Sequence, residues 1–150
     1  MEVPDRHIRM NLISAITNAG AVHFMTYKQT MTATLFITFL TQLLDTTSKK
    51  VLLIVDSLPA HVAAEVEAWV DARPQQIELF FLPRYAPELN ADEYLNNDLK
   101  ESVNAAGLPH DTPELGSRIQ QFMSQLLRLP EHVRSYFQHP AVQYAAAIPL

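Results

Sequence analysis

The chain has 150 residues, a formal net charge of −5 and no cysteine. A chain of this length is expected to form one domain with its own core, and the lack of cysteine excludes disulfide frameworks, thiolate zinc sites and cysteine nucleophiles. The acidic balance counts against strong autonomous binding of nucleic acid, because phosphate contacts require basic side chains. We find no signal-peptide pattern and no apolar stretch near the ~20 residues of a membrane span, so we expect a cytoplasmic protein with no membrane partner.

The first third of the chain predicts a hairpin and then a helix. Apolar and β-branched residues on both sides of the turn signal Asn18-Ala19-Gly20 predict a β-hairpin over residues 8–28. Apolar residues at helical spacing then predict an amphipathic helix over 31–47. The continuous apolar run in 50–56 predicts a central parallel strand that is buried on both faces.

The rest of the chain predicts a βαβ unit followed by helices. These elements are helix 60–72, strand 76–82, helix 92–106, helix 112–128 and a short helix 131–138. Gly107 suits the end of one helix, and Asp111 with Pro113 suits the start of the next. We expect the tail from residue 140 to be ordered only in part. This order of elements predicts an α/β sheet that mixes antiparallel and parallel strands.

Carboxylates follow the predicted central strand and open a later helix. Asp56 comes at the carboxyl end of its strand, where open α/β sheets bind ligands, although it could equally cap the segment that follows. Asp92 and Glu93 either complement a helix dipole or, together with Asp56, hold Mg2+ or Mn2+. Two such ions can clamp the attacking and leaving oxygens of a phosphoryl displacement. His61 is either a polar residue at a helix start or a proton-transfer aid beside the metal.

Other site chemistries lack their sequence patterns. The remaining histidines show no metal-ligand spacing, which disfavours a zinc site. The chain has no Gly-rich phosphate loop and no G-x-S-x-G motif, which disfavours nucleotide hydrolases and α/β-hydrolases.

Two segments of the chain carry a distinctive pattern, VLLIVDSLPAH at 51–61 and IELFFLPRYAPELNADEY at 77–94. They resemble the catalytic core of bacterial insertion-sequence transposases of the mariner superfamily, and the resemblance extends over roughly residues 9–138. In that family a ribonuclease H-like domain carries an Asp-Asp-Glu triad. Its second Asp ends a strand and precedes Asn-x-x-x-His, and its third acid lies in a Pro-Tyr-Ser/Ala-Pro-Glu-Leu-Asn-Pro-x-Glu block. Here 36 residues lie between Asp56 and Glu93, close to the spacing of the superfamily.

The resemblance assigns roles to five residues. It implies that Asp56 is the second triad acid and Glu93 the third, and that both are catalytic metal ligands. It implies supporting roles for His61, Asn90 and Asp92. A complete site would hold two Mg2+ or Mn2+ ions, and its partner would be DNA, both transposon ends and target.

The sequence also departs from the family. Ser57 stands where the family has Asn, and Arg84 and Ala91 replace prolines. The family's first triad Asp lies on a strand before the hairpin, and Asp5 does not lie in a strand pattern. We therefore expect residues 1–150 to form a partial, N-terminally truncated catalytic domain without the preceding helix-turn-helix region. Its fold would be an α/β, ribonuclease H-like mixed sheet flanked by helices, with the first strand missing.

Two functions follow from the resemblance as hypotheses. The first is metal-dependent DNA cleavage and strand transfer during transposition of an insertion sequence. The alternative is a catalytically inactive remnant or regulatory fragment that pairs with a full transposase or its missing N-terminal part. Because a missing central strand exposes strand edges, we expect a rearranged sheet, a homodimer or a strand supplied by a partner. An unrelated α/β nuclease or phosphatase would use the same metal chemistry, but it does not account for the 77–94 block.

Overall fold

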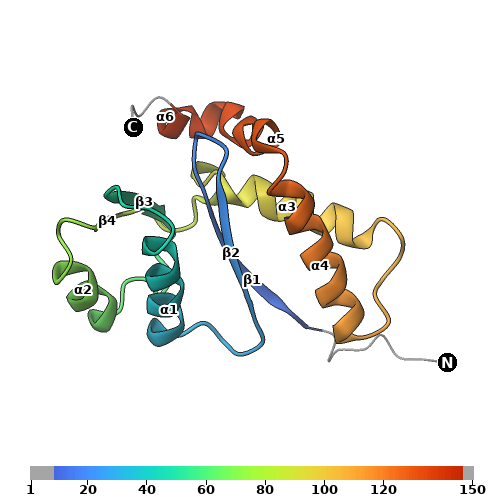
Figure 1. The fold of residues 1–150 in the computed structure, drawn as a ribbon, viewed down its shortest axis with the longest axis horizontal. Coiled ribbons are helices and arrows are strands. Elements are labelled where there is room, and N and C mark those ends of the chain that lie inside the picture. The colour runs from blue at the N-terminus through green and yellow to red at the C-terminus, as the bar shows by residue number, and fades with distance from the viewer. Residues whose placement is uncertain (1–8, 147–150) are drawn as a thin grey trace. The chain divides into compact units, whose positions relative to one another are not determined.

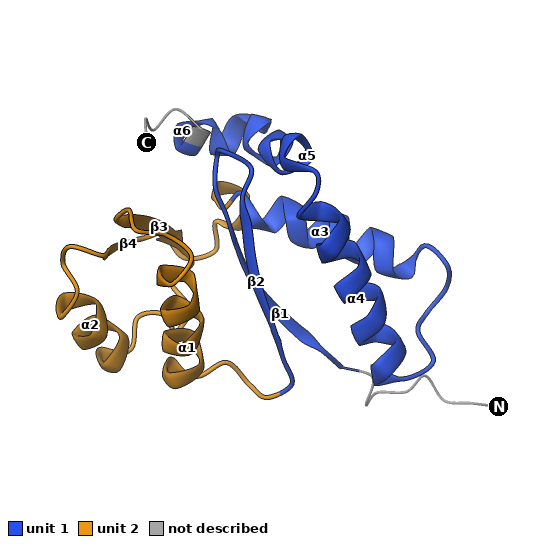
Figure 2. Ribbon diagram, viewed as in Figure 1, with its two compact units in different colours: residues 1–28, 91–150 blue, residues 29–90 orange. Residues whose placement is uncertain are grey.

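The computed structural model describes residues 9–146, so Asp5 and the start of the predicted hairpin at Ile8 lie outside the described residues. Four strands and several helices follow one another along the chain (Figure 1). Their bounds are β1 Asn11–Ile16, β2 Val22–Tyr27, α1 Ala33–Leu44, β3 Val51–Val55, α2 Ala64–Asp71, β4 Ile77–Phe81, η1 Pro87–Leu89, α3 Asp92–Asn104, α4 Thr112–Leu126, α5 Pro130–Ser135, η2 Tyr136–Gln138, η3 Pro140–Val142 and α6 Gln143–Ala146. The chain divides into two compact units, one of residues 29–90 and one of the remaining residues (Figure 2).

A hairpin begins the larger unit. β1 and β2 pair antiparallel from Asn11 opposite Tyr27 to Ile16 opposite Val22. The turn between them closes with a hydrogen bond from Gly20 N to Thr17 O, and Gly20 has a φ of +99°. A positive φ is readily adopted by glycine, which explains why the turn signal contains it.

Helices α3, α4 and α5 build the core of the larger unit. Apolar side chains repeat every four residues along α3, at Leu95, Leu99 and Val103, and all three are buried. They form one cluster with residues of α4, α5 and η2, and the hairpin packs against this cluster. The other buried members are Ile119, Met123, Leu126, Val133 and Tyr136.

The connection between α3 and α4 follows the local signals of the sequence. Gly107 has a φ of +93° just after α3 ends, and Asp111 caps α4 by accepting a hydrogen bond from Glu114 N at 2.8 Å. Arg118 of α4 donates to the carbonyl oxygens of Val103 and Gly107. Its guanidinium therefore supplies hydrogen-bond donors to carbonyl groups at the end of α3 and just after it.

The smaller unit contains the predicted βαβ arrangement. β3 and β4 pair in parallel, from Val51 opposite Ile77 to Val55 opposite Phe81, and α2 lies between them in the chain. Helix α1 contacts α2 and supplies three of the most buried side chains of this unit, which are Phe36, Phe39 and Leu40. Ile77 of β4 and Val66 of α2 are also buried.

Two expectations for this unit were wrong in part. β3 is not buried on both faces, because the side chain of Leu52 is 48% exposed, and Phe80 on β4 is 46% exposed. Within the described residues β3 pairs with β4 alone, so no further strand covers its other edge. α2 begins at Ala64 and not at residue 60, because His61 N and Val62 N both bond to Leu58 O in a turn.

The fold is mixed α/β, with one antiparallel and one parallel two-stranded sheet flanked by helices. This arrangement is consistent with a ribonuclease H-like α/β fold. Across residues 9–146 we find no helix with the length and apolar character needed to cross a membrane.

Candidate functional site

Asp56 is the first residue after β3 and lies at the carboxyl end of the parallel pair. Pairing continues past the strand, because Leu82 N donates to Val55 O at 2.8 Å. The side chain of Asn90 returns to this point and donates from Nδ2 to Asp56 Oδ1 at 3.0 Å. Because the acceptor is a carboxylate, this hydrogen bond is stronger than one between neutral groups. It also fixes the direction in which the carboxylate points.

The segment between β4 and Asn90 is joined by a hydrogen bond at each of its two ends to the residues that follow β3. Ser57 Oγ donates to Leu82 O at 2.5 Å on one side, and Asn90 binds Asp56 on the other. Between them, Asn90 N donates to Pro87 O at 3.0 Å and closes the η1 turn. The segment between Leu82 and Asn90 is therefore hydrogen-bonded at both ends to Ser57 and Asp56, directly after β3. We call residues 83–89 the Pro83–Leu89 loop.

His61 contacts the backbone of Asp56. Its Nδ1 lies 3.0 Å from Asp56 O, and because a carbonyl oxygen only accepts, Nδ1 carries the proton. The side chain is 8% exposed and its ring lies 4.3 Å from the ring of Phe36. Burial lowers the pKa of His61, while the hydrogen bond to the Asp56 carbonyl and the charge of Asp56 oppose that change. His61 thus precedes α2 and supports the end of the strand, and its neutral form is favoured.

Asp92 and Glu93 occupy the first turn of α3, where negative charge complements the helix dipole. Asp92 Oδ1 accepts a hydrogen bond from Ser14 Oγ of β1 at 2.7 Å. This contact ties the start of α3 to the hairpin inside the larger unit. Glu93 is partly buried in the same turn.

The predicted site residues divide between the two units. Asp56, His61 and Asn90 belong to the smaller unit, where both other side chains contact Asp56. Asp92 and Glu93 belong to the larger unit. Across the described part of the chain, no group of three or more acidic, histidine or cysteine side chains is arranged to hold a metal ion. The oxygens of Asp56 match the ligand preference of Mg2+ and Mn2+, and the nitrogen of His61 does not.

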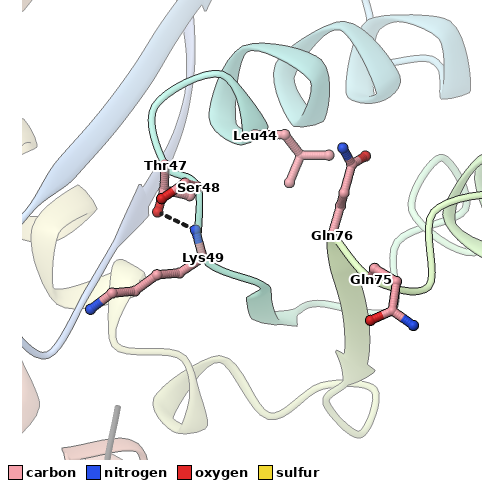
Figure 3. A pocket seen from close by; sticks show the side chains of 6 residues that line it. All are labelled: Leu44, Thr47, Ser48, Lys49, Gln75 and Gln76. Atoms are coloured by element: carbon pink, nitrogen blue, oxygen red, sulfur yellow. Dashed lines mark hydrogen bonds between the residues drawn. The ribbon is translucent and has the colours of Figure 1, made fainter.

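A small pocket of about 110 Å³ lies at the opposite end of the parallel strands (Figure 3). Its walls come from the end of α1, the segment before β3 and the segment before β4, and they contain Leu44, residues 47–49 and Gln75 with Gln76. Lys49 N donates to Thr47 Oγ at 3.1 Å within it. Since Asp56 follows the other end of β3, this pocket is not part of the Asp56 site.

Sequence reasoning missed a polar cluster in the larger unit. Asp98 Oδ2 accepts from Tyr136 Oη at 2.6 Å and lies 2.7 Å from His132 Nε2. Burial acts to raise the pKa of Asp98, but the hydrogen bonds from Tyr136 and His132 prevail and lower it. Burial and the nearby Asp98 carboxylate raise the pKa of Tyr136. These residues lie 34 and 38 positions apart, so no local spacing signal indicates the cluster.

Comparison with known proteins assigns the family. The comparison with curated proteins finds no match. A family model described as DDE superfamily endonuclease matches residues 1–115, which is more than half of the chain and includes Asp56, Asn90 and Glu93. The chain therefore belongs to the DDE superfamily endonuclease family.

Proposed function

We propose that this chain is the catalytic part of an insertion-sequence transposase of the mariner superfamily. Its reaction would be metal-dependent cleavage of DNA at transposon ends and transfer of the cut strand to a target. Asp56 and Glu93 would be the carboxylate metal ligands, and a third acid, which is assigned to no residue of this chain, would complete the site. The family match and the resemblance of residues 51–61 and 77–94 both support this proposal.

The observation that carries the proposal is the hydrogen bond from Asn90 to Asp56. It attaches the end of the Pro83–Leu89 loop to the residue predicted as the second triad acid. Glu93 follows Asn90 by three residues. Since consecutive Cα atoms are 3.8 Å apart, the covalent chain allows Glu93 Cα to lie at most about 11 Å from Asn90 Cα. Chain connectivity therefore supports the proposal that Asp56 and Glu93 serve one site.

The contacts around Asp56 hold its carboxylate in one orientation, as a metal ligand requires. Asn90 holds Oδ1, and His61 holds the backbone carbonyl of the same residue. Bound Mg2+ or Mn2+ ions would supply charge stabilisation at a phosphodiester and favour the ionised nucleophile. Asn90 would limit the rotation of the Asp56 side chain, so that the ligand is already oriented before the ion binds. His61 would fix the backbone from which that side chain projects.

Metal binding tests the proposal directly. We would titrate Mn2+ into the full chain by calorimetry and compare it with Asp56→Asn and Glu93→Gln. Asp71→Asn is the matched control, because Asp71 is an exposed carboxylate at the end of α2. We expect both site variants to weaken binding at least about tenfold, which corresponds to about 1.4 kcal/mol, and the control to match the unaltered chain. Equal affinity in all four proteins would contradict the assignment.

A second candidate function is a catalytically inactive or regulatory fragment that pairs with a full transposase or with the missing N-terminal part. It is favoured by the strand pairing, because within residues 9–146 each strand pairs with one neighbouring strand and has a second edge without a strand partner, where another chain could add a strand. Coexpression with the upstream reading frame distinguishes the two functions. Restored nicking of supercoiled plasmid, lost again in Asp56→Asn, supports a split enzyme. Stable association without nicking supports the regulatory fragment.

A further inference from the structure

The backbone of the Pro83–Leu89 loop is strained at Tyr85. Tyr85 has a φ of +59°, and within residues 9–146 it is the sole residue other than glycine with a positive φ. A side chain in this region costs roughly 1–2 kcal/mol, because Cβ approaches the carbonyl oxygen. Such a conformation persists when the surrounding structure determines it, and residues in it cluster at functional sites. We therefore ask what holds Tyr85 in this conformation and what function the conformation serves.

The attachments of the loop explain how the strain is maintained. Ser57 Oγ binds Leu82 O before the loop, and Asn90 Nδ2 binds Asp56 Oδ1 after it. Pro83 and Pro87 have restricted φ angles, and this removes freedom from the backbone between the two attachments. The loop is therefore a short, closed segment that starts and ends beside Asp56.

The strain is not offset by packing of the Tyr85 ring. The side chain is 97% exposed, whereas burial of an aromatic ring is a large source of stability in folded proteins. Arg84 immediately precedes it and is exposed as well. The loop thus exposes a guanidinium and an aromatic ring on two consecutive residues. A phosphate pairs with the first kind of group, and a base stacks on the second.

The charge of the chain also indicates that Arg84 contacts a nucleic-acid phosphate. With a net charge of −5, the chain as a whole does not attract a phosphate backbone, so a local cation must do so where a strand approaches Asp56. Arg84 is the cation within the Pro83–Leu89 loop. We propose that the loop is a DNA-contact element, in which the Tyr85 ring stacks on an unpaired nucleobase and Arg84 binds an adjacent phosphate of the strand held at Asp56. This inference rests on the proposed function, since it assumes a DNA substrate.

Fluorescence of DNA tests the stacking contact. We would titrate the full chain into a single-stranded oligonucleotide that carries 2-aminopurine, because stacking on an aromatic ring quenches this base. The variants are Tyr85→Ala, Tyr85→Phe and Tyr85→Gly. We expect Tyr85→Ala and Tyr85→Gly to bind about tenfold more weakly and to lose the quench, while Tyr85→Phe stays within about twofold of the unaltered chain. Glycine tolerates the positive φ, so the Tyr85→Gly variant should keep the fold intact.

Salt dependence tests the cationic contact. Arg84→Gln should lower the slope of log affinity against log salt by about one, because one phosphate contact is lost. Arg128→Gln is the matched control, since Arg128 is an exposed arginine two residues after α4 and its substitution removes the same charge. We expect this control to leave the slope unchanged.

Failure of the inference differs from failure of the proposed function. If the unaltered chain binds DNA and Tyr85→Ala binds and quenches equally well, the loop contact is wrong while the proposed function stands. If the unaltered chain binds no DNA with Mn2+ present, the proposed function and the loop contact both fail. If Tyr85→Ala alters the oligomeric state in sedimentation and leaves DNA binding unchanged, the loop is a protein interface and the inference is wrong.

Discussion

Two glycines with nearly the same backbone conformation provide a sharp test of packing in the larger unit. Gly20 has a φ of +99° and Gly107 a φ of +93°, so alanine meets similar backbone strain at both positions. Their surroundings differ. A Cβ on Gly20 would lie 2.6 Å from Pro130 O and 2.7 Å from Pro130 Cβ, whereas a Cβ on Gly107 would meet nothing within 4 Å.

The magnitude of each substitution follows from these contacts. The positive φ costs alanine roughly 1–2 kcal/mol, and the reduced entropy of the unfolded chain returns about 0.4–1 kcal/mol. Both effects act equally at Gly20 and Gly107, so they cancel in the comparison. The contact with Pro130 adds an overpacking cost of about 1–3 kcal/mol at Gly20 alone, because backbone atoms must shift. We therefore expect Gly20→Ala to be about 2 kcal/mol less stable than Gly107→Ala.

Urea denaturation followed by far-UV circular dichroism measures the difference, provided that the m-value is the same in both variants. A gap of about 2 kcal/mol corresponds to about 4–8 °C in Tm for a chain of this size. Hydrogen exchange of the α5 peptide around Pro130 shows whether the loss falls in the larger unit. Equal stability of Gly20→Ala and Gly107→Ala would refute the packing of the hairpin turn against the start of α5.

Three further predictions concern single side chains. Tyr136→Phe should lower the free energy of unfolding by about 1.5–3 kcal/mol in urea titrations, because Asp98 loses a buried donor, and an unchanged midpoint would show that this hydrogen bond contributes nothing. Asp111→Ala should cost about 1 kcal/mol in the same assay, because Glu114 N loses its cap, with Asp71→Asn as the control that stays within about 0.5 kcal/mol. Burial lowers the pKa of His61 in the folded chain, so its contribution to stability is complete above about pH 6.5 and is lost as pH falls through the lowered pKa. Stability measured from pH 7.5 to pH 4.5 should therefore fall less in His61→Phe, and parallel curves would contradict this reasoning.

Much of the candidate site could be identified from the sequence, but its contacts could not. The position of Asp56 follows from the apolar run before it, and His61 lies five residues further on, whereas Asn90 was identified by the resemblance of its block to the transposase family. The structure brings Asn90 and His61 into contact with Asp56, and their supporting roles stay predictions. The choice of the Asp56 backbone as the partner of His61 was not predicted, because it depends on the turn at Leu58 and on burial against Phe36.

Local patterns in the sequence determined the elements of this protein. Helical and alternating periodicity, the glycine turn near Gly20 and the cap at Asp111 all act within a few residues, so the sequence predicts the hairpin, the βαβ unit and the starts of α3 and α4. The start of α2 differed most from its prediction, because His61 N and Val62 N both donate to Leu58 O and hold these residues in a turn.

Contacts between distant segments were decided by the tertiary structure alone. Ser14 with Asp92, Asn90 with Asp56 and the cluster around Asp98 join residues 34 to 78 positions apart. The exposure of Leu52 and of Tyr85 likewise depends on which surfaces meet. Periodicity shows which face of an element is apolar, but the loop paths and the strand register determine what that face packs against.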